Sequence, residues 1–147
     1  MKKETSVGGI IFYLTKKGEI FYLLLKYPSL KRKRVYWGFA KGRKEEGEED
    51  KETLIREIKE ETGLEKIEIF DGFLEDTSYF FWRDKERVFK KVIFYLVRAK
   101  EKKVKISFEH EDAKWFSYDK AMKVLSFSNY RNLLKKANDF LRERYLK

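Results

Sequence analysis

The sequence predicts an α/β or α+β sandwich, in which helices cover a sheet. Short apolar segments typical of strands occupy most of the chain. One helical pattern interrupts them over 50–62, and further helices end the chain. The 147 residues suffice for one domain with its own core, over 1–147.

The first third of the chain is expected to form strands. Val7–Leu14 and Ile20–Leu25 read as strands, and Lys16-Lys17-Gly18-Glu19 between them favours a hairpin turn. A basic loop is expected over Pro28–Arg34. A short extended segment follows over Trp37–Ala40.

The internal helix is expected over Asp50–Thr62. Leu54, Ile55 and Ile58 give it an apolar stripe at helical spacing. Acidic residues in its first turn suit the partial positive charge of a helix N-terminus. Gly63 stands where a left-handed C-terminal cap is expected.

The second half of the chain is expected to form four strands and two closing helices. The strands are expected over Lys66–Phe73, Leu74–Phe81, Val88–Val97 and Lys114–Phe116. A charged turn over Trp82–Arg87 separates the second from the third. The helices are expected over Tyr118–Leu125 and Asn129–Tyr145.

Composition restricts the class of protein. Lysine and arginine number 35 against 25 acidic residues, a net charge of +10 that favours anionic partners, although a lysine-rich solvated surface would give the same charge. The absence of glutamine and the three asparagines resemble the usage of proteins from hot environments. No cysteine and one histidine exclude disulfides, thiolate metal sites and sites with several imidazoles. Without a secretory signal or an apolar run of ~20 residues, a cytoplasmic protein with no membrane partner is expected.

Three glutamates of the internal helix lie on one arc. At about 100° per residue, Glu57, Glu60 and Glu61 flank the apolar stripe. Like charges at these spacings repel one another. A divalent cation such as Mg²⁺ takes oxygen ligands and leaves room for phosphate oxygens, so it would remove the repulsion. A glutamate-rich solvated helix is the alternative.

The segment from Gly42 to Leu64 favours the metal site. It reads GRKEEGEEDKETLIREIKEETGL and resembles the Nudix box, G-x5-E-x7-R-E-U-x-E-E-x-G-U, where U is a bulky aliphatic residue. Every defined position fits: Gly42, Glu48, Arg56, Glu57, Ile58, Glu60, Glu61, Gly63 and Leu64. A chance match is on the order of one in ten million per position. The resemblance extends over most of the chain, because strands precede the box and strands and a helix follow it.

The resemblance implies a Nudix-type α/β/α sandwich with a mixed central sheet, a loop–helix–loop catalytic motif and a C-terminal helix. Nudix enzymes hydrolyse a nucleoside diphosphate linked to another group, with Mg²⁺ or Mn²⁺ as cofactor. Glu57, Glu60 and Glu61 match the metal-binding positions. A backbone carbonyl of Lys41 or Gly42 often completes the metal shell. Water bound to the metal loses a proton more easily and attacks phosphorus.

The resemblance also implies roles around the metal ligands. Glu48 and Arg56 usually support the loop through a salt bridge. The general base is a box glutamate in some members and a glutamate of a later loop in others, where Glu109 and Glu111 lie. His110 between them is either a substrate contact or an ordinary loop residue.

Regions outside the box look most like the asymmetric diadenosine tetraphosphate hydrolases. W-G-F-A-K-G over 37–42 resembles their W-x-x-P-K-G, and the segments 109–111 and 114–116 resemble their H-E-H and R-W-L. Tyr79 lies close to the place of their marker tyrosine. The departures are alanine for the proline, a missing first histidine and extra residues over 82–87.

A polyphosphate with a base needs cations and aromatic surface. An ordinary surface side chain is the alternative explanation of each cationic position except Lys41, and a place in the core is the alternative for the strand aromatics. The candidate substrate-binding residues are Lys41, Arg43, Lys44, Tyr79, Lys90, His110 and Tyr130. Phe127 is expected to pack beside the last of these.

The sequence therefore predicts a metal-dependent hydrolase that cleaves diadenosine tetraphosphate to ATP and AMP. Within the same class, 5′-triphosphorylated RNA or a nucleoside triphosphate is the alternative substrate. A non-catalytic nucleotide- or RNA-binding module is the alternative of another class, but all the box glutamates are present. The sequence predicts no oligomeric state.

Overall fold

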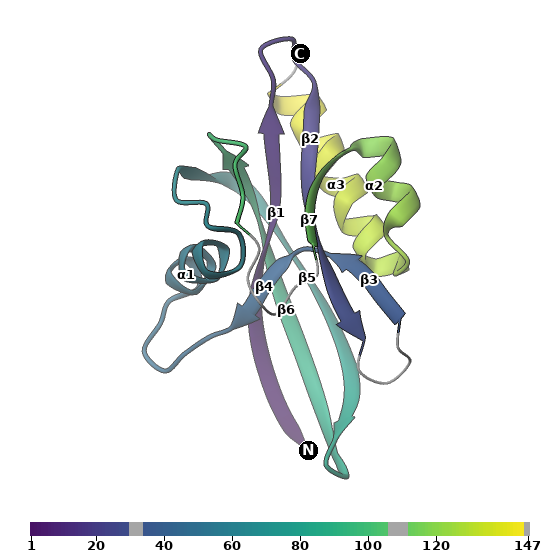
Figure 1. Cartoon of the computed structure of the whole chain (residues 1–147). Coiled ribbons are helices and arrows are strands. Elements are labelled where there is room, and N and C mark those ends of the chain that lie inside the picture. Colours follow the sequence, from purple (N-terminus) through teal and green to yellow (C-terminus); the bar gives the residue numbers. More distant parts are fainter. Residues whose placement is uncertain (30–33, 106–111, 146–147) are drawn as a thin grey trace.

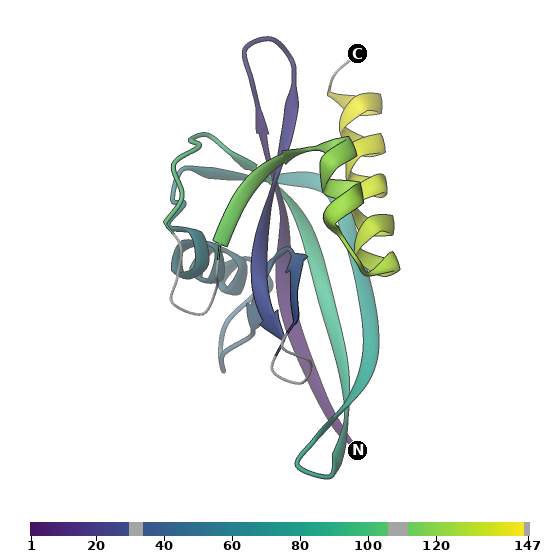
Figure 2. The same cartoon turned by 45° about the vertical axis from the view of Figure 1, so that its right-hand side comes forward.

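The structure is a computed structural model that describes residues 1–29, 34–105 and 112–145. In this part of the chain, a mixed sheet of seven strands lies between helix α1 on one face and helices α2 and α3 on the other (Figure 1, Figure 2). The elements are β1 (Lys2–Leu14), β2 (Ile20–Ser29), β3 (Arg34–Gly38), β4 (Ala40–Arg43), α1 (Asp50–Thr62), β5 (Ile67–Arg83), β6 (Glu86–Ala99), β7 (Asp112–Ser117), α2 (Tyr118–Val124) and α3 (Ser128–Arg144). The predicted α/β/α sandwich is confirmed.

Strand β1 contributes to both cores. It pairs in parallel with β6 over most of its length, and antiparallel with β2 and β4. The strand order is β3-β2-β1-β6-β5, and β7 pairs with β2. Because side chains alternate along a strand, Val7 and Ile11 pack toward α1, whereas Ile10 and Phe12 pack toward α2 and α3.

Helix α1 buries a narrower stripe than the sequence predicts. Leu54 and Ile58 are buried against the sheet. Ile55 is 49% exposed, so its place in the stripe is wrong. It lies about 100° around the helix from Leu54, beyond the face that contacts the sheet.

The short strand β4 brings the start of the box to α1. It pairs antiparallel with β1, with Lys41 opposite Gly8 and Gly42 opposite Val7. At the start of α1, the backbone N–H of Glu49 donates to the carboxylate of Glu52 at 3.0 Å, as in a capping box. The sheet therefore fixes one end of the intervening loop, and the cap fixes the other.

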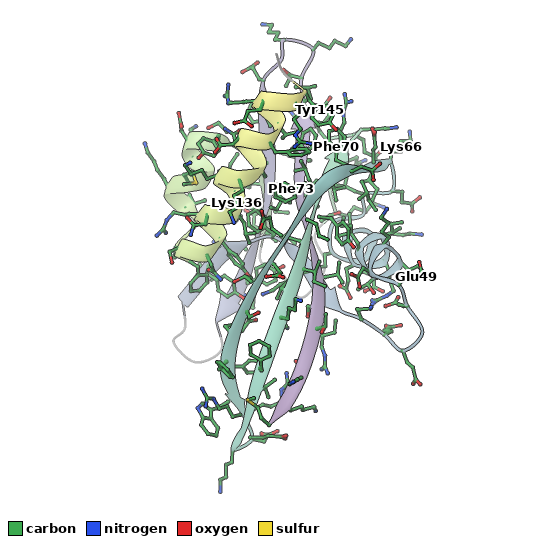
Figure 3. All side chains as sticks on the ribbon, turned by 180° about the vertical axis from the view of Figure 1, so that it is seen from behind. Glu49, Lys66, Phe70, Phe73, Lys136 and Tyr145 are labelled. Atoms are coloured by element: carbon green, nitrogen blue, oxygen red, sulfur yellow. The ribbon has the colours of Figure 1, made fainter. Side chains whose placement is uncertain are left out.

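Strand β5 is one continuous strand, where the sequence predicts two, over 66–73 and 74–81. Its pairing with β6 shifts register around Gly72, whose φ of 90° suits glycine. The bulge puts Phe70 and Phe73 on the same face, where both pack toward the C-terminal part of α3 (Figure 3). A glycine interpreted as a strand break is thus a bend within a strand.

The loop predicted over Pro28–Arg34 is shorter than expected. Strand β2 continues through Pro28, and β3 begins at the last residue of the predicted loop; residues 30–33 lie outside the described residues. Pairing of β2 with β7 ends at Lys26, so proline falls where one side of the strand no longer pairs with β7. The predicted segment Trp37–Ala40 divides between β3 and β4.

The turn predicted over Trp82–Arg87 is also shorter. Asp84 and Lys85 form it, with φ angles of 48° and 66°, between paired ends of β5 and β6. Two successive residues with positive φ match the twist of a tight hairpin. The strands therefore extend further than the charged sequence suggests.

The closing helices begin and end within one residue of their predicted limits. Helix α3 buries Leu133, Leu134, Ala137 and Leu141 against the sheet. Among the helices of the described residues, none has the length and apolar character needed to span a bilayer.

Replacing Gly63 by alanine is expected to lower the free energy of unfolding. Gly63 ends α1 with a φ of 76°, and its N–H donates to the carbonyl of Lys59 at 2.9 Å, as predicted. An added Cβ would meet Lys105 Cβ at 3.3 Å. We expect a loss of about 1–2 kcal/mol in urea unfolding. Gly18 also has a positive φ, but a Cβ there would meet open space, so Gly18→Ala should lose less free energy of unfolding. Equal losses would contradict the contribution of the contact with Lys105.

Candidate active site

Arg56 holds the loop that precedes α1. Its Nε and Nη2 donate to the two carboxylate oxygens of Glu48 at 2.7 and 2.9 Å. These bonds, together with the N–H of Glu45, lower the pKa of Glu48 to about 2. The structure therefore contains the salt bridge that the family resemblance implies.

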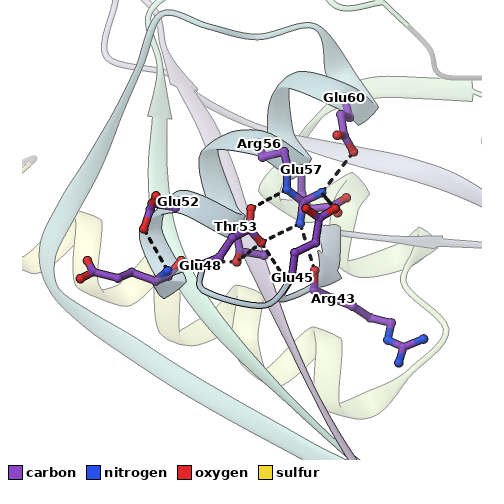
Figure 4. A network of polar contacts seen from close by, with 9 residues as sticks. Arg43, Glu45, Glu48, Glu52, Thr53, Arg56, Glu57 and Glu60 are labelled. Atoms are coloured by element: carbon purple, nitrogen blue, oxygen red, sulfur yellow. Dashed lines mark hydrogen bonds and ion pairs between the residues drawn. The ribbon is translucent and has the colours of Figure 1, made fainter.

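The same guanidinium connects three parts of the chain (Figure 4). Nη2 also donates to the carbonyl of Arg43 in β4 at 3.1 Å. Nη1 donates to Glu57 at 2.7 Å and lies 3.4 Å from the carboxylate of Glu60. One cation thus offsets the repulsion among several carboxylates of the box.

Glu57 lies directly against the backbone of Gly42. A Cβ built on Gly42 would stand 1.9 Å from the Glu57 carboxyl carbon and 2.2 and 2.3 Å from its oxygens. Any side chain here would displace the carboxylate. Glycine is therefore required at this first position of the box because it leaves space for the Glu57 carboxylate, and not because of its backbone conformation.

Glu61 is buried, with 5% of the residue exposed. One of its oxygens accepts from the backbone N–H of Lys41 and the other from the hydroxyl of Tyr27, both at 3.2 Å. The Tyr27 hydroxyl also donates to the carbonyl of Phe39 at 2.7 Å. Burial raises the pKa of Tyr27 well above its usual value, so the hydroxyl remains a donor.

The carboxyl groups of Glu57 and Glu61 lie close together. Burial raises the pKa of Glu57 to about 7; the hydrogen bond from Arg56 opposes this rise, and the nearby Glu61 adds to it. Glu57, which holds a proton near neutral pH, and the buried carboxyl group of Glu61 beside it form an oxygen-rich site that a divalent cation would neutralise.

Glu60 does not converge with these two carboxylates. Its side chain is 59% exposed and is directed toward Arg56. Over the ranges that the structure describes, no group of three or more potential metal-ligating side chains is present. The structure therefore brings Glu57 and Glu61 together and leaves the carboxylate of Glu60 beside Arg56.

A cleft of about 480 Å³ opens over Glu57 and Glu61. It is lined by Tyr27, Lys41, Gly42, Arg43, Lys44, Glu45, Arg56, Glu57 and Glu61. Cationic side chains thus surround an acidic floor. Such an arrangement suits a phosphate group bound through a metal ion.

An aromatic pocket of about 330 Å³ adjoins the cleft at Lys41, which lines both. Its other residues are Tyr36, Tyr79, Phe127, Asn129 and Tyr130. The Lys41 ammonium donates to the Tyr130 hydroxyl at 2.8 Å and lies 5.9 Å from the centre of the Tyr79 ring. The structure therefore brings these three predicted residues together, and Phe127 packs beside Tyr130 as expected.

Lys90 lies on β6, opposite Tyr79 in the neighbouring strand β5. Burial lowers its pKa, and the positive charge of Lys41 lowers it further. Lys90 is therefore close enough to the cleft and the aromatic pocket to attract an anion bound there.

Two other predicted phosphate contacts are engaged with carboxylates. Arg43 lies 3.1 Å from the buried Glu4, and Lys44 lies 2.9 Å from Asp50. Both still line the cleft. The remaining candidates, Glu109, Glu111 and His110, lie outside the described residues.

Sequence reasoning missed Tyr27, Tyr36 and Asn129. Tyr27 and Tyr36 belong to strands paired with each other, so their rings stack 5.2 Å apart. Asn129 donates to Thr77 at 3.1 Å across the pocket wall. Two tyrosines at paired positions of neighbouring strands are the pattern that could have identified the stack. The loop predicted over 28–34 left the pairing of these strands unpredicted.

Comparison with known proteins decides the family. The family model of the NUDIX domain matches residues 3–137. The chain belongs to the Nudix family. The predicted membership and the expectation of a Nudix hydrolase are thus confirmed, and hydrolases of this family generally need divalent metal ions.

Relatives of this Nudix chain carry a shared name. The asymmetrical bis(5′-nucleosyl)-tetraphosphatase of Sus scrofa is 31% identical over 110 residues, 72% of each chain. The enzyme of that name from Caenorhabditis elegans is 29% identical over 91% of this chain and 94% of its own. A C. elegans Ap4A hydrolase binary complex superposes with a TM-score of 0.80 and 26% identity, over 95% of this chain and 98% of that chain.

Substituting Gly42 by alanine should abolish metal binding without unfolding the chain. In the unmodified protein, millimolar Mg²⁺ should raise the melting temperature by mass action. The added Cβ displaces Glu57, so Gly42→Ala should lose this rise. Gly47→Ala in the same loop meets open space and should keep the rise. A full Mg²⁺-dependent rise in Gly42→Ala would contradict the assigned contact.

The raised pKa of Glu57 predicts a pH dependence of stability. The folded chain holds a proton on Glu57 up to a pH of about 7, whereas the unfolded chain releases it near 4.5. Without divalent cations, the free energy of unfolding should therefore fall by about 3 kcal/mol as the pH rises through this interval. Urea unfolding in EDTA measures this fall. Glu57→Gln should flatten the profile, and parallel profiles would refute the assignment.

Proposed function

We propose that this Nudix hydrolase cleaves diadenosine tetraphosphate to ATP and AMP with Mg²⁺, or Mn²⁺, as its cofactor. The observation that carries the proposal is the joining of an acidic, cation-lined cleft to an aromatic pocket through Lys41. A phosphate chain ending in a nucleoside needs both surfaces side by side. The names of the pig and nematode relatives support the same substrate.

Glu57, Glu60 and Glu61 would hold the cation, with a backbone carbonyl of Lys41 or Gly42. The fit rests on the oxygen donors, on the close approach of Glu57 to Gly42 and on the raised pKa of Glu57. A bound divalent cation makes its water more acidic and offsets charge on the phosphoryl oxygens.

The chain's own residues orient these groups. Arg56 fixes Glu57 through a hydrogen bond of 2.7 Å, while its other nitrogens keep the loop in place through Glu48. Lys41 and Lys90 would neutralise phosphates that the metal does not reach. Glu109 and Glu111 remain candidates for the general base, beside the glutamates of the box.

The aromatic pocket would hold one adenine. Tyr36, Phe127 and Tyr130 form consecutive edge-to-face contacts at 5.3 and 5.8 Å, and Tyr79 lies across from them at Lys41. Phe127 is 46% exposed, so part of its ring is accessible. Flat apolar walls accept a base by stacking.

An assay of diadenosine tetraphosphate, ATP and 5′-triphosphorylated RNA with Mg²⁺ tests the proposal. The dinucleotide should give ATP and AMP at the highest rate. Glu61→Gln should lose activity on the order of 100-fold or more, because the buried carboxylate loses its charge. Glu65→Gln, an exposed partner of Lys59, should keep the unmodified rate.

Two results would contradict the proposal. An inert dinucleotide beside a hydrolysed triphosphate would show that the substrate is wrong. An unmodified rate in Glu61→Gln at saturating Mg²⁺ would remove this carboxylate from the catalytic machinery.

A further inference from the structure

Tyr27 stands between the acidic cleft and the aromatic pocket. Its hydroxyl reaches the Glu61 carboxylate, and it lines the cleft. Its ring stacks on Tyr36, with centroids 5.2 Å apart and planes 12° apart. Tyr36 lines the aromatic pocket. One side chain therefore touches the catalytic carboxylate at one end and supports the base-binding wall at the other.

Strand pairing fixes this stack. Tyr27 on β2 and Tyr36 on β3 are directly opposite each other in the antiparallel register. Gly38 of β3 provides space, since a Cβ there would meet Tyr130 at 3.2 Å and Tyr27 at 3.4 Å. Rings mounted on paired strands hold their separation better than rings on loops.

The hydroxyl joins two other elements. It has one proton and two acceptors, the Phe39 carbonyl between β3 and β4 at 2.7 Å and Glu61 of α1 at 3.2 Å. The other oxygen of Glu61 accepts from Lys41. Both carboxylate oxygens thus accept hydrogen bonds, and removing the hydroxyl removes one of the contacts that orient this carboxylate.

We propose that Tyr27 is a positioning residue that sets the distance between the base pocket and the box carboxylates, and so selects which phosphorus is attacked. The inference rests on the proposed function. Successive phosphorus atoms of a polyphosphate are chemically alike and separated by a single bridging oxygen. The enzyme therefore selects one of them by distance from the bound base, and the Tyr27–Tyr36 stack is the layer that fixes this distance.

The hydroxyl and the ring are tested separately. Tyr27→Phe keeps the stack and loses the bond to Glu61. It should weaken Mg²⁺ binding about three- to tenfold in calorimetric titration of the nucleotide-free protein, and still give ATP and AMP. Tyr27→Leu loses both functions, so weakened Mg²⁺ binding should be joined by ADP among the products. Tyr36→Leu removes the facing ring alone and should give ADP with unmodified Mg²⁺ binding, which keeps the test decisive if Tyr27→Leu does not fold.

Tyr22→Phe is the matched control. Tyr22 lies on the same strand, and its buried hydroxyl donates to Asn138 at 2.8 Å in the other core. The control should lower the melting temperature while leaving Mg²⁺ binding and products unchanged. Unmodified Mg²⁺ binding in Tyr27→Phe, or products without ADP in the leucine variants, would overturn the proposal.

The outcome for the unmodified chain separates the two proposals. If it leaves diadenosine tetraphosphate intact, the proposed function fails. The product comparison is then made with ATP, where AMP and diphosphate are distinguished from ADP and phosphate. A shifted ratio in the leucine variants still supports the role of Tyr27, and an unchanged ratio still refutes it.

Discussion

The hydrogen bonds of Arg56 are the interaction on which the site depends. Its guanidinium contacts the carboxylates of four glutamates and the carbonyl of Arg43, and these five residues come from β4, the loop and α1. Without a central cation, carboxylates at these spacings would repel one another and turn into solvent. The bidentate bond to Glu48 holds the loop, and the remaining nitrogen holds Glu57 against Gly42. The carboxylates of Glu57 and Glu61 thus both line one cleft.

This arrangement trades stability for function. Glu57 is partly buried beside the buried Glu61, which is unfavourable until a cation neutralises the pair. Arg56 and Tyr27 hold the two carboxyl groups in this arrangement through hydrogen bonds, and Gly42 leaves space for Glu57. The surrounding lysines lie where phosphates would add their own negative charge. A bound cation and a polyphosphate would therefore balance the charges of the cleft.

The sequence predicts contacts between residues that are close along the chain, and it misses contacts between residues that are far apart along it. The Glu48–Arg56 bond, the Gly63 cap and the meeting of Glu57 with Glu61 follow from spacing within one loop and one helix. The stack of Tyr27 on Tyr36 and the bulge at Gly72 depend on strand register, which local patterns do not contain. Glu60 departs from its expected place. Its position on the helix predicts that it lies with Glu57 and Glu61, but its carboxylate lies beside Arg56.

The parallel pairing of β1 with β6 has a consequence for synthesis on the ribosome. The box, its loop and α1 all lie between these two strands in the chain. The amino-terminal hairpin can form as soon as it leaves the exit tunnel, but the face on which α1 rests needs Val97 and Ala99 of β6. Nascent chains that end before β6 therefore present a half-covered apolar layer to solvent and to chaperones. Such long-range closure also makes folding slow compared with that of helical bundles of the same size.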